Sequence, residues 1–563
     1  MSWMQQKRSE KLLAGERGTR RKIWNDQLTV CLAYPNVYRI GMSNLGFQTV
    51  YGLLNRLPGC LCERIFLPDP TEGDASRQEA LVSMESQRPL KEFDILAFAL
   101  PFENDYPYVL RMLEQAGIPM EAGSRDDSDP LIMAGGIAVT LNPEPLSSFV
   151  DLFLLGEAEE LLPEFVERYD NVLRQGKKRG DRLFAVQRDV TGVYVPALYS
   201  VSYQSDGTIQ EMKPADEALP GKIRRRWVRD ISAFVTEQVI TTPETEFGEL
   251  FLTEVSRGCQ RGCRFCAAGF VYRPLRFRRM EALETSFIRG IALGKKIGLL
   301  GTAVSDHPQL ADLCRHVLGR GGSFSLGSLR TDRVNREMAA LLRESGVETV
   351  ALAPEAGTQR LRDVLHKGIS EAHIFHAVEC LVKERIRQIR LYFMIGLPTE
   401  TEADIEGIIV LTRRIRHHAL QISKGKQPFK RIILSINQFI PKSSTPFQWH
   451  PLEDIRIVRK KLQRIERVLH REGSVKVLHD LPKWNYIQTL LSLGDRRVGQ
   501  ILLEVHQSGG NWSQALKKVN LNPDFYVYRS KDIREILPWD FIDQGIDKSM
   551  LIREYQQALL EIS

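Results

Sequence analysis

From about residue 27 onward, the hydrophobic and polar positions alternate between two kinds of segment. Short apolar runs rich in β-branched residues are separated by longer stretches that have apolar residues at helical spacing. Five short runs predict strands: LTVCLAYP, CERIFLP, FDILAFALP, PLIMAGG and VDLFLLGE. FQTVYGLLNRL, YPYVLRMLEQAG and EELLPEFVERYDNVL predict helices between or after them. We therefore expect residues 27–180 to form an α/β domain, a Rossmann-like, doubly wound parallel sheet.

A second series of strands follows a change of rhythm. Residues 181–245 predict a linker with a small β element, because VYVPALYSVSYQSDGTIQEM resembles a hairpin closed at Ser205-Asp-Gly207. Six further apolar runs then alternate with helical stretches: GELFLTEVS, KIGLLG, SFSLGS, ETVALAPEAG, QIRLYFMIGLP and RIILSINQFIP. They predict a partial (β/α)6 TIM-type barrel over residues 246–452, with its chemistry on the loops after the strands. Residues 453–563 read as a small, mainly helical C-terminal region.

The composition is that of an ordinary globular protein, with 43% hydrophobic and 26% charged residues in 563. At this length more than one hydrophobic core is expected. The chain contains no run of about 18 uncharged apolar residues, the length that could span a bilayer. Its first residues also lack the apolar stretch of a secretory signal. We therefore expect a cytoplasmic protein.

Much of the formal charge of +7 is concentrated at the beginning of the chain. The first 25 residues carry seven Lys or Arg against Glu10 and Glu16, so residues 1–26 read as a basic arm. A second basic run, Lys222 to Arg229, precedes the barrel. Such patches can follow a phosphate backbone, which makes RNA one candidate partner, but short charge runs are more often solvated linkers and faces.

Three of the eight cysteines fall within eight positions, after the first predicted barrel strand. Cys259, Cys263 and Cys266 have the spacing CxxxCxxC. Three thiolates around a four-iron, four-sulfur cluster leave one iron open to a substrate that chelates through an amine and a carboxylate. The alternative is structural zinc, which normally takes four Cys or His ligands. No fourth cysteine is near in sequence, and His307 is the nearest candidate downstream.

The segment Gly258-Cys-Gln-Arg-Gly-Cys-Arg-Phe-Cys266 resembles that of the radical S-adenosylmethionine (SAM) superfamily. Together with Ala267-Ala-Gly269 and Tyr272-Arg-Pro274, it is similar to the subgroup with an N-terminal cobalamin-binding-type domain. Five later segments at predicted strand ends also match: Leu300–Asp306, Ser328–Arg330, Pro354–Gly357, Met394–Glu400 and Phe439–Lys442. The resemblance implies a radical SAM enzyme that reductively cleaves SAM to a deoxyadenosyl radical, with flavodoxin or ferredoxin as electron donor.

By position, the resemblance also implies which residues contact SAM. Phe265 is the aromatic residue before the third cysteine, and Arg330 would meet the methionine carboxylate. Glu355 would bond the ribose hydroxyls or the amine, although an ion pair with a neighbour such as Arg360 is the alternative. Relatives carry Gly-Gly-Glu where this chain has Gly301-Thr302-Ala303, so Ser305 or a backbone carbonyl would replace the missing acid. Ile395 and Leu397 would provide backbone for the adenine.

In the first domain the resemblance points to cobalamin, with one departure. Relatives with a histidine ligand to cobalt carry Asp-x-His-x-x-Gly, whereas this chain has Asn36-Val-Tyr38-Arg-Ile-Gly41. A phenol with a pKa of about 10 is a poor cobalt ligand at neutral pH, so cobalt would lack a ligand from this motif. Gly135, Gly136 and Gly156 would let the nucleotide tail approach the backbone, but they also suit plain helix–sheet packing.

Three functions remain open at this point, and no catalytic residue or substrate is predicted. The first is cobalamin-dependent methyl transfer or carbon-skeleton chemistry, as in a class B-type methyltransferase. The second is a cobalamin-independent radical SAM enzyme that modifies tRNA or ribosomal material. The third is a zinc-stabilised nucleic-acid-binding protein.

Overall fold

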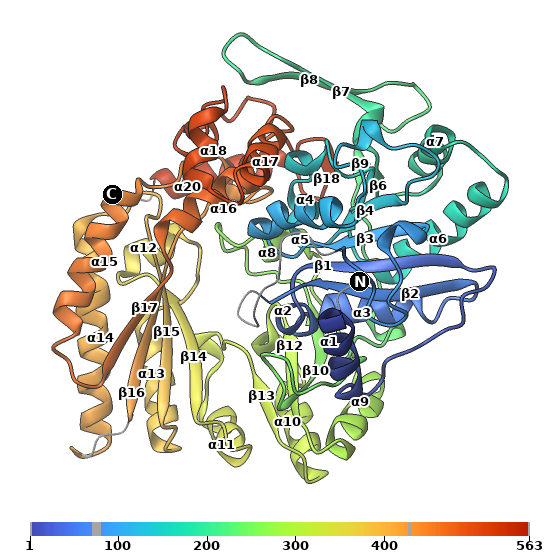
Figure 1. The fold of residues 1–563 in the computed structure, drawn as a ribbon. Helices are drawn as coiled ribbons and strands as arrows, with labels where there is room; N and C mark the ends of the chain where they lie inside the picture. The colour runs from blue at the N-terminus through green and yellow to red at the C-terminus, as the bar shows by residue number, and fades with distance from the viewer. Residues whose placement is uncertain (1–2, 70–79, 426–428, 561–563) are drawn as a thin grey trace.

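The computed structural model describes residues 3–69, 80–425 and 429–560. The N-terminal sheet domain, here called the front domain, lies beside a barrel of strands and helices, and a helical C-terminal region contacts both (Figure 1). Within the described ranges, no helix combines the length and apolar character that a membrane crossing requires.

The front domain is built on a six-stranded sheet with the order β2-β1-β3-β4-β5-β6. Its strands are β1 (Leu28–Val37), β2 (Cys60–Leu67), β3 (Ile95–Ala99), β4 (Leu131–Gly135), β5 (Leu152–Leu154) and β6 (Val193–Tyr194). The first five are parallel and β6 pairs antiparallel with β5. This is the flavodoxin-like strand order, whose switch point for ligands lies between β1 and β3.

Helices cover both faces of this sheet, because successive strand residues point to opposite sides. Cys31 and Ala33 of β1 pack into one core cluster, and Val30 and Leu32 into another. Helix α4 (Tyr106–Gln115) covers the first face, whereas α3 (Leu45–Leu54) and α6 (Ala158–Arg174) cover the second. The predicted doubly wound sheet is confirmed.

The barrel consists of two four-stranded sheets around one hydrophobic core. The first has the order β11-β10-β12-β13 and the second β14-β15-β16-β17. A parallel bridge between Leu329 and Leu352 connects them. The strands are β10 (Leu250–Arg257), β11 (Arg276–Phe277), β12 (Lys296–Gly301), β13 (Phe324–Leu326), β14 (Thr349–Glu355), β15 (Gln388–Ile395), β16 (Arg431–Gln438) and β17 (Val475–His479). The six predicted strands thus form the expected partial barrel.

Helices flank the barrel strands and complete its outer layer (Figure 1). They are α9 (Met280–Ala292), α10 (Leu310–Gly319), α11 (Arg336–Glu344), α12 (Gln359–Val364), α13 (Glu371–Lys383), α14 (Glu402–Ile422) and α15 (Ile455–Leu469). Strand β17 was not predicted. Only Val475 and Val477 of this five-residue strand pack against the barrel core, so its apolar pattern is too short to stand out.

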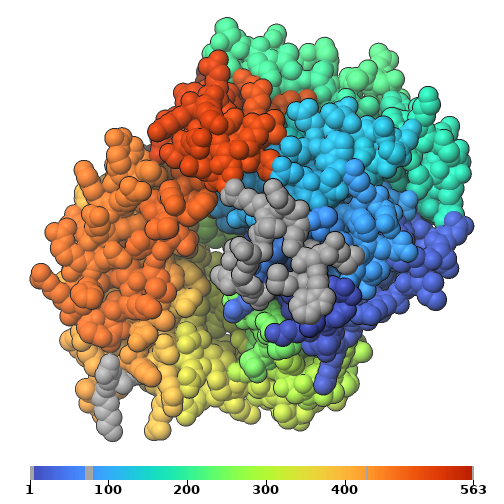
Figure 2. Space-filling model, viewed as in Figure 1, coloured from blue at the N-terminus to red at the C-terminus, as the bar shows by residue number. Residues whose placement is uncertain are grey.

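The C-terminal region bridges the front domain and the barrel. It contains α16 (Pro482–Leu493), α17 (Val498–Gln507), α18 (Trp512–Lys518), α19 (Asp524–Val527) and α20 (Lys548–Leu560). Helix α17 packs on α4 of the front domain, and α20 packs on residues 446–449 beyond β16. Figure 2 shows the C-terminal helices, in red, at the top of the view between the orange part of the chain and the front domain. Strand β18 (Ile542–Asp543) pairs in parallel with β9 (Ile223–Arg224) of the linker, whose predicted hairpin, β7 (Tyr199–Tyr203) with β8 (Ile209–Pro214), also forms.

The basic N-terminal segment is not wholly a solvated arm. It contains helix α1 (Trp3–Ala14), and the side chain of Glu16 after it is fully buried. Arg64, also fully buried, donates to both oxygens of Glu16 at 2.8 and 2.7 Å and to Glu85 at 2.7 Å. A buried carboxylate that loses its partner leaves an uncompensated charge, so this contact anchors the segment to the front domain.

Candidate active site

The three cysteines lie on the loop after β10, here called the cysteine loop (residues 258–267), beyond the carboxyl end of a barrel strand. Gly258 has φ +86°, and a Cβ there would lie 2.3 Å from the Tyr272 carbonyl oxygen. Glycine is therefore required where the loop leaves the strand. Arg264 anchors the far side, because its amide donates to the Leu365 carbonyl at 3.0 Å and its guanidinium to Glu554 of α20 at 3.0 Å.

The thiols of the cysteine loop lie close enough to influence one another. Cys263 is buried, whereas Cys259 and Cys266 are half-buried. Burial, and after it the neighbouring thiols of Cys263 and Cys259, raise the pKa of Cys266 to about 11. Soft metal ligands of this kind must lose their protons on binding, so cluster assembly releases protons here. The donor set of three thiols on one loop fits a four-iron cluster with an open iron.

A zinc site has less support. Among the residues that the structure describes, no three His, Cys, Asp or Glu side chains, the three cysteines included, are grouped closely enough to hold a single metal ion. Structural zinc would in addition need a fourth ligand. His307, the candidate fourth ligand, is buried and both its ring nitrogens are in contact with protein: Nε2 with the Arg278 carbonyl at 3.2 Å and Nδ1 with the Gln309 amide at 3.1 Å. Burial lowers the pKa of His307, which keeps the ring neutral. The remaining cysteines are buried at other positions.

Several predicted SAM contacts form one connected group beside the cysteine loop. The Ser305 hydroxyl accepts from the Arg330 amide at 3.2 Å, and the Arg330 guanidinium donates to the Lys367 carbonyl at 3.2 Å. Lys367 forms a buried ion pair with Glu355 at 2.9 Å, and its ammonium lies 6.0 Å from the centre of the Phe265 ring. The charges of Lys367 and Arg330 also act on Cys263, so the group borders the cluster ligands. Glu355 therefore has an ion-pair partner, but it is Lys367 and not Arg360.

The other predicted SAM contacts lie at the edges of this group. Arg330 is not free, because it also pairs with Asp332 at 3.0 Å. Ile395 and Leu397 are buried at the end of β15, and the amide of Leu397 is directed at the Glu400 carboxylate at 3.5 Å. Thr302 instead lines a cavity toward the front domain.

That cavity, here called the front cavity, has a volume of about 500 Å³ and lies at the seam between front domain and barrel. Its front-domain walls are the ends of β3 and β4 and the first turns of α3 and α6, and its barrel wall includes Leu300–Thr302. It therefore opens at the switch point between β1 and β3, and most of its lining is apolar. Gly135, Gly136 and Gly156 all line it.

Asn36, Tyr38 and Gly41 do not line the front cavity. The Tyr38 hydroxyl donates to Glu16 at 2.6 Å, and burial and then the Glu16 charge raise its pKa above the usual value. Asn36 donates to Asp105 at 2.9 Å. A Cβ on Gly41 would lie 2.4 Å from the Phe66 ring, so close packing explains this glycine. The sequence analysis assigned these three residues to the same cobalamin site as Gly135, Gly136 and Gly156. In the structure only those three glycines line the front cavity.

Two family models match the chain. The one described as "Radical SAM proteins, N-terminal" matches residues 46–196, and the one described as "Radical SAM superfamily" matches residues 253–411. The second match contains the cysteine loop, Arg330 and Glu355. The chain belongs to the radical SAM superfamily.

Curated relatives extend this match over most of the radical SAM chain. An uncharacterized protein of Methanocaldococcus jannaschii is 28% identical over 506 residues, which cover 89% of this chain and 96% of that protein. A tRNA-2-methylthio-N(6)-dimethylallyladenosine synthase of Moorella thermoacetica is 24% identical over 37% of this chain and 50% of its own length. An uncharacterized methyltransferase of Pyrococcus horikoshii is 23% identical over 50% of this chain and 58% of its own length. The chain thus covers only about half of the last two.

Solved structures of radical SAM enzymes are similar at low identity. The methyltransferase TsrM from Kitasatospora setae has a TM-score of 0.48 at 12% identity, covering 75% of this chain and 74% of its own. The cobalamin-dependent enzyme OxsB, with aqua-cobalamin and SAM bound, has a TM-score of 0.47 at 16% identity. The match covers 95% of this chain and 79% of the OxsB chain.

A buried ion network joins the front domain to the radical SAM barrel at the front cavity. Arg257, at the end of β10, donates to Glu157 at 2.9 Å, Glu159 at 2.6 Å and Glu254 at 2.9 Å. Arg276 binds both oxygens of Glu157, at 2.8 and 2.7 Å. Although burial opposes its charge, these two arginines lower the pKa of Glu157 below its usual range. The network therefore fixes α6 of the front domain to the first barrel strand.

Sequence reasoning missed both Lys367 and this ion network. Lys367 follows α12 in a loop without any motif, and Glu157 is only the last residue of the run VDLFLLGE. Their partners are far away in sequence, so no local pattern could identify the pairs. The one available signal was the presence of charged residues directly at predicted strand ends.

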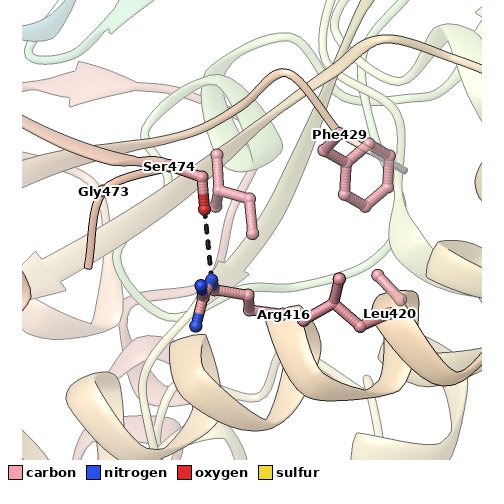
Figure 3. A pocket seen from close by; sticks show the side chains of 7 residues that line it. Arg416, Leu420, Phe429, Gly473 and Ser474 are labelled. Atoms are coloured by element: carbon pink, nitrogen blue, oxygen red, sulfur yellow. Dashed lines mark hydrogen bonds between the residues drawn. The ribbon is translucent and has the colours of Figure 1, made fainter. Parts of the chain in front are cut away.

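A separate pocket of about 390 Å³ lies at the opposite end of the barrel strands (Figure 3). It is formed by the end of α14 and by residues just before or at the start of β16 and β17. Arg416 donates to the Ser474 hydroxyl at 3.2 Å across it, opposite Phe429. In barrels of this type the amino-terminal end of the strands serves stability, so we assign the chemistry to the cysteine-loop end.

Proposed function

We propose that this radical SAM enzyme cleaves SAM reductively at a four-iron cluster held by Cys259, Cys263 and Cys266. The observation that carries the proposal is the set of three thiols on one loop, next to the Arg330, Lys367 and Glu355 group and without a fourth protein ligand among the described residues. Such a cluster supplies a free iron for the amine and carboxylate of SAM and the electron that breaks it into methionine and a deoxyadenosyl radical. Anaerobic incubation of the iron-loaded protein with SAM and dithionite should yield methionine and 5′-deoxyadenosine.

In this proposal the residues of the chain bind and orient SAM. Arg330 donates to the methionine carboxylate and gives up part of its contact with Asp332. Glu355, held in place by Lys367, accepts from the ribose hydroxyls or the amine. Ser305 or a carbonyl near Thr302 replaces the acid that relatives carry. Phe265 covers one side, and the backbone of Ile395 and Leu397 contacts the adenine.

We further propose that the front cavity forms part of a cobalamin site, for methyl transfer or carbon-skeleton chemistry at an unactivated carbon. At about 500 Å³ the cavity is smaller than the whole cofactor, so it would receive only a part of it. The fit rests on the apolar lining at the switch point and on Gly135, where an added Cβ would meet no atom closer than 3.6 Å. Gly136 instead packs closely on the Leu100 backbone, whose carbonyl oxygen would lie 2.6 Å from a Cβ. When bound, cobalamin supplies a cobalt centre that can carry a methyl group. Tyr38 is occupied by Glu16 and lies outside the cavity, so cobalt takes no ligand from that motif.

Filling the front cavity should prevent cobalamin binding. A Cβ on Gly135 would meet nothing closer than 3.6 Å, so Gly135→Val adds its side chain at the cavity wall with little strain on the backbone. After reconstitution with hydroxocobalamin, the wild type should retain corrin absorbance through gel filtration. Gly135→Val should retain about a tenth of that absorbance or less, because overpacked sites reject ligand.

The matched control is Gly123→Val, where no atom lies within 4 Å of a Cβ. It should retain cobalamin as the wild type does. If the wild type retains no corrin, or if Gly135→Val retains as much as Gly123→Val, the cobalamin proposal is wrong.

A second candidate, modification of RNA, is supported by one surface feature. Arg20, Arg56 and Arg289 line a pocket of about 250 Å³ beside the basic N-terminal segment, with Glu237 as its one carboxylate. One relative is named for action on tRNA. Arginine clusters bind phosphates, and such binding weakens steeply with salt.

Because Glu16 anchors this segment, deletion of residues 1–25 would damage the front domain, and charge reversal is the cleaner test. The double variant Arg20→Glu and Arg56→Glu should weaken binding of bulk tRNA about tenfold at low salt and reduce its salt dependence. Arg431→Glu, an exposed arginine at the start of β16 in the other barrel sheet, is the control. Equal tRNA binding by both variants would exclude this surface.

A further inference from the structure

The second basic run of the linker forms part of a basin beside the cysteine loop. This basin, here called the basic basin, has a volume of about 630 Å³ and is lined by Arg224, Arg225, Trp227, Cys259, Gln260, Arg273, Pro274, Leu275 and Asp543–Gly545. Tyr272 lines the front cavity, whereas the next residues, Arg273 and Pro274, line the basin. The two spaces thus lie on different sides of one chain segment that packs against Gly258.

The basin is strongly positive. Three arginines line it against one aspartate, Asp543. Within the described part of the chain, the exposed Arg224 has no side-chain partner, and Arg273 is held by the Gly269 carbonyl at 2.8 Å and the Phe270 ring rather than by a carboxylate. Arg226 and Arg276, the neighbours that do have carboxylate partners, do not line the basin.

One of these arginines is buried without a direct ion pair, although the charges of Glu157 and Asp543 act on it. Arg225 is 4% exposed, its Nη2 donates to the Arg273 carbonyl at 2.9 Å, and its Nε has no partner. The side-chain oxygen of Gln544, another buried residue of the lining, is also unpaired. A buried guanidinium that no carboxylate contacts directly costs stability, so the basin favours an anionic partner.

The basin also provides the approach to one cluster ligand from solvent. Its rim residues Arg224, Gln260, Pro274 and Gly545 are exposed, and the half-buried Cys259 also lines it. Cys263 and Cys266 do not line it. A partner seated on the rim would therefore approach the cluster through Cys259, on a different side from the front cavity.

We propose that the basic basin is the docking surface for an acidic one-electron donor protein of the flavodoxin or ferredoxin class. This inference rests on the proposed function, because reductive cleavage consumes one electron per SAM. In the docked complex one electron passes from the donor to the cluster: the donor is oxidised by one electron, the cluster is reduced by one, and no proton or group moves. The positive rim attracts the acidic donor and sets its association rate.

Charge substitutions on the rim test the surface with a purified bacterial flavodoxin as the probe. Arg224→Glu should raise the Kd for flavodoxin, measured by titration without turnover, about tenfold at low salt. Asp543→Asn, which keeps an acceptor for the Gly545 amide, should lower the Kd about twofold to threefold. Raising salt from about 50 mM to about 500 mM should weaken wild-type binding and reduce the difference between variants.

Deoxyadenosine formation separates this surface from the cleavage chemistry. With dithionite as reductant, Arg224→Glu and Asp543→Asn should form deoxyadenosine at the wild-type rate, whereas with reduced flavodoxin their rates should follow their Kd values. Arg431→Glu controls for a general loss of positive charge. Flavodoxin affinities that are equal in Arg224→Glu, Asp543→Asn and Arg431→Glu would overturn the docking surface. Loss of the dithionite-driven reaction in the wild type would instead overturn the proposed function.

Discussion

Replacing Cys259, Cys263 and Cys266 together with alanine should give a folded, colourless protein that retains less than about a tenth of the wild-type iron. The thiols are the metal ligands of the proposed site, and the loop that carries them is held by contacts of Gly258 and Arg264 that do not involve sulfur. The wild type, purified or reconstituted without oxygen, should be brown. Iron analysis and visible absorbance measure the difference.

Cys314→Ala and Cys380→Ala are matched controls, since both thiols are buried in the barrel core away from the cysteine loop. Each should keep the wild-type iron content and lose only about 1 kcal/mol of stability, the usual cost of a small deletion in a core. Zinc at one equivalent and no iron in the wild type, or full iron in the triple variant, would be inconsistent with the cluster.

Replacing Arg257 with methionine should destabilise the protein by about 3–5 kcal/mol, the largest loss expected from one side chain. Methionine keeps most of the apolar volume but leaves Glu157, Glu159 and Glu254 without the guanidinium that contacts all three. Urea unfolding monitored by tryptophan fluorescence measures the change. The front domain and the barrel should also separate earlier in the transition, because the network connects them.

Arg315→Met is the comparison for an exposed ion pair. Its partners Asp312 and Glu337 are about half exposed, and such pairs contribute at most about 1 kcal/mol. If Arg257→Met unfolds at the same urea concentration as Arg315→Met, the network does not stabilise the seam between the domains.

The front-domain sheet and the barrel could be predicted from the sequence because most of their strands are apolar runs. Parallel strands buried on both faces, such as ILAFA in β3, carry a strong local signal. Strand β17 carries little, because only two of its residues reach the core. The position of Glu16 was equally hidden: a carboxylate in a basic segment appears solvated until its distant partner Arg64 is known.

In the candidate site, too, the local features could be predicted from the sequence and the long-range contacts could not. The cysteine spacing is local, and one loop carries all three thiols. The ion pair between Lys367 and Glu355 and the ion network at Arg257 join residues from different elements, which spacing cannot reveal. A local motif can also mislead. The motif position predicted a place in the cobalamin site for Asn36, Tyr38 and Gly41, but none of them lines the front cavity.

Quantifying 5′-deoxyadenosine is the most direct test of reductive SAM cleavage. Wild-type protein with a full cluster, incubated without oxygen with SAM and dithionite, should form deoxyadenosine and methionine in equal amounts over several turnovers. The triple cysteine variant should form none above the background without protein. Deoxyadenosine formed by the triple variant, or its absence from wild-type protein that holds an intact four-iron cluster, would contradict the account.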